Sequence, residues 1–230
     1  MIPIKIESAW RGASDCLSCG IRDLALFADL TQEDFGQIHA PIDDLLYKRD
    51  HTVFFEGEEA SYIYTVRTGR LKLVKSTSDG HARIVGIVRP GDVMGLEALV
   101  SRRYETEAVA LSSVSLCRIP NVVIRHLAEK NTSLHAKLMA RWHRALTESG
   151  NLLSGMNYGT ARQRVINLIK TLREPSDQNV TILLSRQDMG SLTDLKLETV
   201  SRVVASLVRE GYLIPIDKQG RQYTISKPLD

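Results

Sequence analysis

The sequence lacks the features that would set it apart from ordinary globular proteins. No run of about 18 apolar residues is present, so no transmembrane helix is expected. Three cysteines among 230 residues are too few for a scaffold held together by disulfides. The segment Met1–Glu7 lacks the apolar core of a signal peptide, which favours a cytoplasmic location. The apolar share of 43% and the charged share of 25% are typical of one or two folded domains.

The sequence also lacks the signatures of catalysis. It contains no Ser/His/Asp arrangement, no metal-hydrolase pattern and no glycine-rich phosphate loop, so no enzyme is expected. The formal charge is only +3, but the whole excess of Lys and Arg over Asp and Glu falls between Tyr158 and Asp230. This uneven distribution is a mild indication that the C-terminal third binds nucleic acid.

Short strands are predicted between Tyr47 and Pro120. Several runs there alternate apolar and polar residues or are rich in β-branched and aromatic residues, and turn glycines at positions 57, 69, 80 and 91 separate them. Even spacing of this kind is typical of an antiparallel roll or sandwich. We therefore predict a β-roll sensor domain over residues 25–120, with a short helix beginning at Thr31, after a cysteine-containing segment at 1–24.

The pattern turns helical over residues 121–157. Apolar or small residues recur there at three- and four-residue spacing, as expected for one stripe along one helix face. The stripe could lie on the chain's own core, but charged residues surround it on the other faces, so a seam with a second copy is favoured. None of its positions is a carboxylate, and we expect a homodimer that forms without a cofactor. The stripe consists of Leu134, Leu138, Trp142, Ala145, Ser149, Leu152 and Met156.

Residues 158–230 have the pattern of a winged helix-turn-helix. Helices are predicted at 161–172, 186–194 and 197–210, the last ended by Gly211. A hairpin of residues 212–216 and 222–226 around a Lys-Gln-Gly-Arg turn follows. The fold class is therefore α+β, with an N-terminal antiparallel β-roll, a long dimerisation helix and a C-terminal winged helix-turn-helix.

The second helix of the two-helix motif carries the candidate base-reading residues. Apolar positions from Met189 to Leu207 would pack the two helices together and leave Glu198, Ser201 and Arg202 near the start of the second helix, where a recognition helix enters the major groove. Arginine forks onto guanine O6 and N7, and glutamate accepts from the amine of cytosine. The alternative is an intrahelical Glu–Arg pair on a solvated face.

These residues resemble those of the CRP/FNR superfamily of bacterial transcription regulators. The likeness covers nearly the whole chain, and the segment 198–202 matches the E-x-x-S-R recognition helix of the FNR and FixK branch. The resemblance implies a palindromic site close to TTGAT-N4-ATCAA, a homodimer, contact with RNA polymerase, and activation under anaerobic, redox or nitrogen-oxide control. It also implies phosphate contacts by Arg186 and Gln187, and we expect Thr199 to contact the DNA backbone as well.

The resemblance implies that the β-roll holds an effector, and a cyclic nucleotide is the first candidate. Cyclic-nucleotide sites of the superfamily place a glutamate after a glycine, followed by an Arg-Ser/Thr-Ala pattern for the phosphate. Here Leu96 stands in place of that glutamate, and Tyr104-Glu-Thr-Glu supplies carboxylates where a cation is needed. Cyclic AMP is therefore not expected, although Arg102 and Arg103 lie nearby. A regulator that binds a small molecule, or a gas through haem, remains the alternative.

The cysteines are the second candidate for a sensor. Cys16 and Cys19 have C-x2-C spacing, which in a cytoplasmic protein indicates metal or redox chemistry. Together with Cys117 they match three of the four ligands of the [4Fe–4S] cluster in FNR-type oxygen sensors, while Ala25 stands at the fourth position. A cluster with a non-cysteine ligand such as Asp23, Asp15, water or a small molecule, a thiol switch, and remnant cysteines all stay open.

Overall fold

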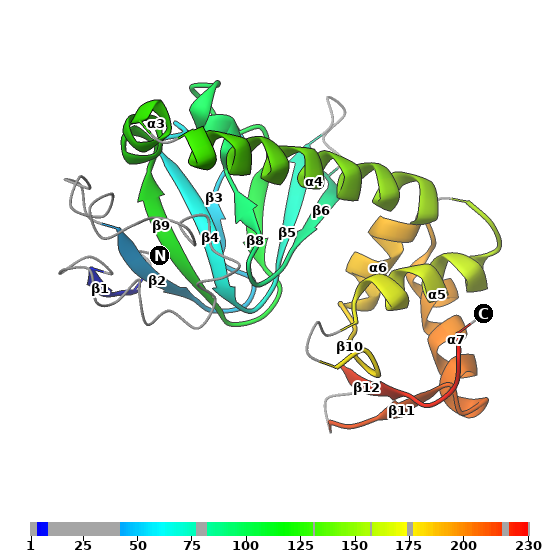
Figure 1. Ribbon diagram of the computed structural model, residues 1–230. Coiled ribbons are helices and arrows are strands. Elements are labelled where there is room, and N and C mark those ends of the chain that lie inside the picture. The colour runs from blue at the N-terminus through cyan, green and yellow to red at the C-terminus, as the bar shows by residue number, and fades with distance from the viewer. Residues whose placement is uncertain are drawn as a thin grey trace. The chain divides into compact units, whose positions relative to one another are not determined.

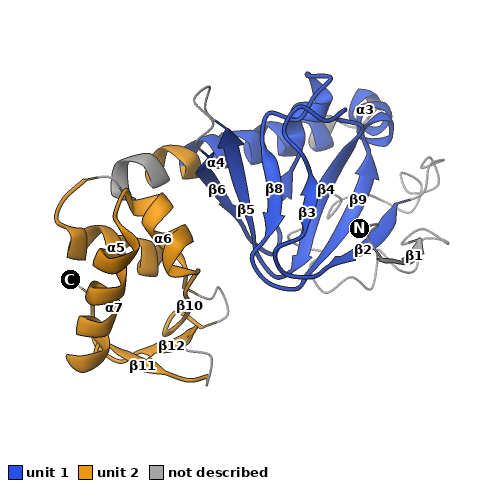
Figure 2. Ribbon diagram, turned by 180° about the vertical axis from the view of Figure 1, so that it is seen from behind, with its two compact units in different colours: residues 1–147 blue, residues 148–230 orange. Residues whose placement is uncertain are grey.

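The computed structural model describes residues 4–8, 42–76, 82–130, 132–156, 158–173, 177–217 and 221–229. The chain divides into two compact units, Met1–Thr147 and Glu148–Asp230 (Figure 2). Within the described residues, no helix combines the length and the apolar character needed to cross a membrane. The two units are described separately below.

The first unit is built from two antiparallel sheets (Figure 1). One has the strand order β1-β2-β9-β4-β7 and the other β3-β8-β5-β6. Their buried side chains form one common core, so the two sheets make a β-roll. The strands are β1 (Ile4–Ser8), β2 (Asp43–Tyr47), β3 (Thr52–Phe54), β4 (Tyr62–Thr68), β5 (Leu71–Ser76), β6 (Ala82–Val88), β7 (Val93–Met94), β8 (Glu107–Ala110) and β9 (Val114–Pro120).

The strands follow from the alternation of apolar residues along them. In β9, Val114, Leu116 and Ile119 are buried in the core, and the intervening residues are partly exposed. The turn between β4 and β5 requires glycine: Gly69 has a φ of 81°, and a Cβ added there would lie 2.3 Å from the carbonyl oxygen of Ser113. The apolar alternation and the turn glycine therefore both indicate the strands and the turn that the structure has in this part of the chain.

The predicted strands between residues 52 and 119 are confirmed, but the structure adds others. β1 lies in the cysteine-containing segment 1–24, where no strand was predicted, and pairs antiparallel with β2. β2 contains no β-branched residue and β7 has only two residues, so neither stands out from the sequence. β1 alternates isoleucine with charged residues, a strand signal that the prediction overlooked. The helix expected at Thr31 lies outside the described residues.

Two helices follow β9 where one was predicted. α3 covers Asn121–Lys130 and α4 covers Thr132–Met156. Ile124 and Leu127 of α3, and Leu134 and Leu138 of α4, are buried in the core of the β-roll. Both helices therefore cover the β-roll, and the first part of α4 is fixed by apolar packing.

The second unit is a three-helix group with a small sheet. Its helices are α5 (Ala161–Thr171), α6 (Arg186–Thr193) and α7 (Leu197–Arg209), close to the predicted ranges. The predicted hairpin is confirmed as β11 (Leu213–Pro215) and β12 (Gln222–Ile225), and β10 (Val180–Ile182) adds a third strand that the sequence did not predict. Thr160 begins α5 with a capping box, since its side chain accepts from the backbone N–H of Gln163 and the side chain of Gln163 accepts from Thr160.

Candidate nucleic-acid interface

A tight turn joins α6 to α7. Asp194 ends α6 in the left-handed conformation, with φ 51° and ψ 46°, and the backbone N–H of Leu195 donates to the carbonyl of Gly190 at 3.0 Å. A Cβ at position 190 would lie 2.6 Å from the carbonyl oxygen of Leu195, a distance shorter than Cβ atoms in real proteins show. Glycine at 190 therefore allows the turn to fold back closely onto α6.

The start of α6 presents two of the predicted phosphate-binding residues. Ser185 caps the helix by accepting from the backbone N–H of Asp188 at 3.0 Å. Gln187 is exposed. Arg186 is half-buried, and its Nη2 lies 3.5 Å from the hydroxyl oxygen of Tyr223 on β12. The contact places the Arg186 guanidinium between α6 and the wing.

α7 has one buried face and one exposed face. Three apolar side chains at three- and four-residue spacing turn into the core of the unit, namely Val200, Val204 and Leu207. The opposite face carries exposed residues at the same helical spacing, namely Glu198, Arg202, Ala205 and Arg209. The sequence prediction had omitted Arg209, although its spacing from Arg202 places it on the exposed face.

The predicted base-reading residues lie near the start of this exposed face. Glu198 and Arg202 are exposed, whereas Ser201 and Thr199 are half-buried beside them. Within the described residues, neither Glu198 nor Arg202 forms a salt bridge or a side-chain hydrogen bond, so the intrahelical Glu–Arg pair that was the alternative is not formed. Glu198 and Arg202, which lie one helical turn apart, are therefore both available to a ligand.

An ion pair holds the far end of α7. Arg162 at the start of α5 donates to both carboxylate oxygens of Glu210, at 3.1 and 2.5 Å. The hydrogen bonds from this guanidinium hold the pKa of Glu210 below its usual range. Arg164 donates to the carbonyl of Thr193 at 3.2 Å, which ties α5 to the end of α6. These contacts position the two helices of the motif on α5.

The wing carries exposed apolar side chains. Ile214 on β11 and Ile216 just after it are each about half exposed. The tip of the wing, residues 218–220, lies outside the described residues. A hairpin strand buries alternate residues only when one of its faces packs against the rest of the protein. The sequence of the hairpin does not show which residues are packed in this way, so the exposure of the two isoleucines was not predicted.

The stripe predicted as a dimer seam divides into two parts. Leu134 and Leu138 are only 2% and 3% exposed within the chain's own core, so these two are corrected to core residues that cover the β-roll. Trp142 and Ser149 are half-buried and Ala145 is exposed. The side chains of Leu152 and Met156 lie outside the described residues. The periodicity of the sequence did not reveal where the stripe leaves the core.

Only one of the three cysteines lies in the described part of the chain. Cys117 is half-buried on β9, and its Sγ lies 3.5 Å from Oδ1 of Asp44, to which it donates. Asp44 also accepts from Arg67 at 2.6 Å. Cys16, Cys19 and Ala25 lie outside the described residues, and so do Asp15 and Asp23. Among the residues that are described, no group of three His, Cys, Asp or Glu side chains could hold a metal.

Comparison with known families matches both units. Residues 45–131 match the model of the cyclic nucleotide-binding domain, and residues 160–228 match the Crp-like helix-turn-helix domain. The chain belongs to the CRP/FNR family. It is therefore a DNA-binding transcription regulator rather than an enzyme, as expected from the sequence.

Individual CRP/FNR proteins are similar over most of their length. The "Transcriptional activator protein anr" of Pseudomonas aeruginosa is 27% identical over 226 residues, which cover 94% of this chain and 90% of the relative. The "Fumarate and nitrate reduction regulatory protein" of Salmonella typhi is 24% identical and covers 87% of this chain and 83% of the relative. The solved structure of FixK2 from Bradyrhizobium japonicum is 27% identical with a TM-score of 0.71, covering 81% of this chain and 93% of that chain.

Proposed function

We propose that this CRP/FNR protein is a homodimer that binds a palindrome close to TTGAT-N4-ATCAA and activates transcription. The observation that carries the proposal is the pair Glu198 and Arg202, exposed and without partners among the described residues at the start of α7. A charged pair that is not used within the protein is what direct readout of base edges in the major groove requires.

Each residue of this surface has a defined role. Arg202 donates to O6 and N7 of guanine, and Glu198 accepts from the exocyclic amine of the paired or neighbouring cytosine. Ser201 contacts an outer thymine. Arg186, Gln187 and Thr199 contact phosphates, which fix the register of α7 in the groove without reading sequence. The half-buried position of Arg186 against Tyr223 favours a phosphate bound between α6 and the wing.

The two-fold symmetry of a palindrome requires two copies of α7. We propose that the copies join through the part of the stripe on α4 that is not used by the chain's own core, beginning at Trp142 and Ala145. Since the stripe contains no carboxylate, no like-charge repulsion opposes the pairing, and the dimer forms without a cofactor. Like other regulators of transcription, the dimer acts where the chromosome lies, in the cytoplasm, and contacts RNA polymerase there.

The interior of the β-roll favours a protein that binds no cyclic nucleotide there. Leu96, which replaces the glutamate expected of such a site, is buried in the core. In the same core Phe54 stacks on both Tyr64 and Tyr104, with ring centroids 4.0 Å apart for Phe54 and Tyr104. A ligand would have to displace this packed cluster, at a cost in buried apolar area.

The signal is proposed from the relatives and not from the site. Names such as "Fumarate and nitrate reduction regulatory protein" support respiratory or anaerobic control. Cys117 lies beside Asp44, with its Sγ 3.5 Å from Oδ1, and Cys16 and Cys19 lie outside the described residues. No step is assigned to an iron–sulfur cluster, and three roles stay open for the cysteines: ligands of a cluster with a non-cysteine fourth ligand, a thiol switch, or remnants without a role in sensing.

The test is binding of the full chain to labelled duplexes by fluorescence anisotropy at fixed salt, without added ligand. One duplex carries TTGAT-N4-ATCAA, and the control carries both half-sites scrambled at the same composition. We expect the palindrome to bind at least about 1,000-fold more tightly, as specific sites do relative to non-specific DNA. Equal affinities for the two duplexes, with the protein folded and dimeric, would contradict the proposed site.

A further inference from the structure

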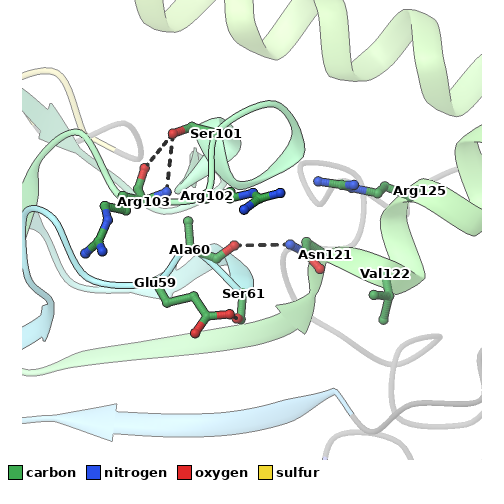
Figure 3. Close-up of a pocket in the computed structure, with 9 residues that line it drawn as sticks. All are labelled: Glu59, Ala60, Ser61, Ser101, Arg102, Arg103, Asn121, Val122 and Arg125. Atoms are coloured by element: carbon green, nitrogen blue, oxygen red, sulfur yellow. Dashed lines mark hydrogen bonds between the residues drawn. The ribbon is translucent and has the colours of Figure 1, made fainter.

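An arginine-lined pocket lies within the first unit of the chain, between the β-roll and α3. Its walls come from three separate segments: the turn before β4, the loop that follows the 3-10 helix Leu96–Leu99, and the first turns of α3. The volume is about 810 Å³, within the usual range for small-molecule sites. Figure 3 shows the side chains that line it.

Two guanidinium groups face each other in this pocket. Arg102 extends from the loop and Arg125 from α3, and their charged ends point toward one another (Figure 3). The Nη2 atom of Arg125 donates to the carbonyl oxygen of Ala98 at 3.1 Å. This hydrogen bond fixes the Arg125 side chain and leaves its other N–H groups for a ligand. Arg102 has no side-chain hydrogen bond or salt bridge to any described residue.

The charge of this pair is not neutralised from within the pocket. Glu59 is the carboxylate that lines it, but its Oε1 lies 3.4 Å from the hydroxyl of Ser61 and it forms no salt bridge with a described arginine. Arg103 donates to the carbonyl of Gly57 at 2.6 Å and points away from Arg102 (Figure 3). Two like charges that face each other across a concave surface are stabilised by an anion between them.

The walls around the pair are already held in shape. Asn121 at the start of α3 donates to the carbonyls of Ala60 at 3.1 Å and Ala98 at 3.2 Å, joining α3 to the turn before β4 and to the 3-10 helix. The hydroxyl of Ser101 donates to the carbonyl of Arg103 at 3.0 Å and fixes the loop. Because the walls are already ordered, less conformational entropy is lost when a ligand binds.

We propose that this pocket binds the phosphate group of a small phosphorylated molecule. Arg102 and Arg125 donate to its oxygens from opposite sides, since arginine forks match the geometry of phosphate. The side chains of Ala60 and Val122 supply apolar surface for the body of the ligand, for which the volume leaves room. The site is separate from the buried aromatic cluster inside the β-roll and does not depend on the DNA-binding proposal.

Bound phosphate would connect the loop, the turn before β4 and α3. A ligand that binds only the folded state raises the melting temperature of the unit that holds it. The probe is inorganic phosphate, added to the full chain at constant ionic strength with chloride as the balancing anion. Binding is measured by calorimetry and by the shift of the melting temperature. Succinate is the second arm, because its carboxylates would use the same arginines.

The variants are Arg102→Gln and Arg125→Gln, with Arg83→Gln as the matched control on an exposed strand position outside the pocket. We expect saturable phosphate binding, weakened about tenfold or more by either pocket variant and unchanged by Arg83→Gln, as the loss of one charged hydrogen bond implies. Arg125→Lys keeps the charge and should retain part of the affinity if Arg125→Gln perturbs folding.

Three results would overturn the proposal. The first is no saturable binding of phosphate by the folded wild-type protein. The second is equal weakening in Arg83→Gln and the two pocket variants, which would indicate general charge screening. The third is tight binding of succinate with none of phosphate, which would assign the pocket to carboxylates. DNA binding is measured in parallel on the palindrome and has no part in any of these outcomes.

Discussion

Replacing Gly190 by alanine tests the turn that sets the angle between α6 and α7. The added Cβ would lie 2.6 Å from the carbonyl oxygen of Leu195, although ordinary contacts begin near 3.4 Å. The turn must therefore open by several tenths of an ångström and strain its hydrogen bond to position 190. Overpacking of this kind costs about 1–3 kcal/mol, and the better helix propensity of alanine returns about 1 kcal/mol.

The expected net loss for Gly190→Ala is about 0–2 kcal/mol in the free energy of unfolding, measured by urea denaturation. Affinity for the palindrome should fall further, because a shifted turn moves α7 in the groove. Gly150→Ala is the matched control, since a Cβ there meets nothing within 4 Å and the substitution should be neutral or slightly stabilising. Unchanged stability and DNA affinity in Gly190→Ala would refute the close approach.

Three further predictions test the helices and the β-roll. Ala145→Glu should convert the dimer to a monomer in light scattering of iron-free protein, whereas Thr147→Glu, on the opposite face of α4, should not; a monomeric wild type would contradict the seam. Leu138→Ala should lower the free energy of unfolding by about 2–5 kcal/mol, without the concentration dependence that a seam residue would show. Burial raises the pKa of Tyr104 to about 12, so its contribution to stability is complete below pH ~10 and is lost as pH rises toward 12. Tyr104→Phe should reduce that alkaline slope in denaturation measured between pH 9 and 12, and an unchanged slope would contradict the assignment.

The fold was largely predictable because local signals agreed with the tertiary structure. Alternation in β9 and the glycine at 69 indicated strand and turn directly. β10 was missed because so short a strand gains its stability from pairing with β12, which no local pattern records. The break between α3 and α4 was missed for a similar reason, since apolar periodicity continues on both sides of it.

The candidate site was predictable to the level of residue type and helix face. Spacing placed Glu198 and Arg202 on one face, and the structure shows that face to be exposed. Spacing could not separate the two roles of the stripe on α4. Leu134 and Leu138 have the same period as Trp142, and only the tertiary structure shows that the β-roll covers the first two. Arg102 and Arg125 are distant in sequence, so their pocket follows only from the fold.

The most direct measurement of the central claim is base selectivity at the guanine of TTGAT. Wild-type protein should bind the palindrome more tightly than a duplex with both of these G·C pairs changed to A·T, by about 1–3 kcal/mol per pair. Arg202→Ala should show a clearly smaller preference, since only the contact of Glu198 with cytosine is left, while Gln187→Ala should weaken both alike and keep the full preference. Undiminished preference for guanine in Arg202→Ala would show that α7 does not read DNA through this residue.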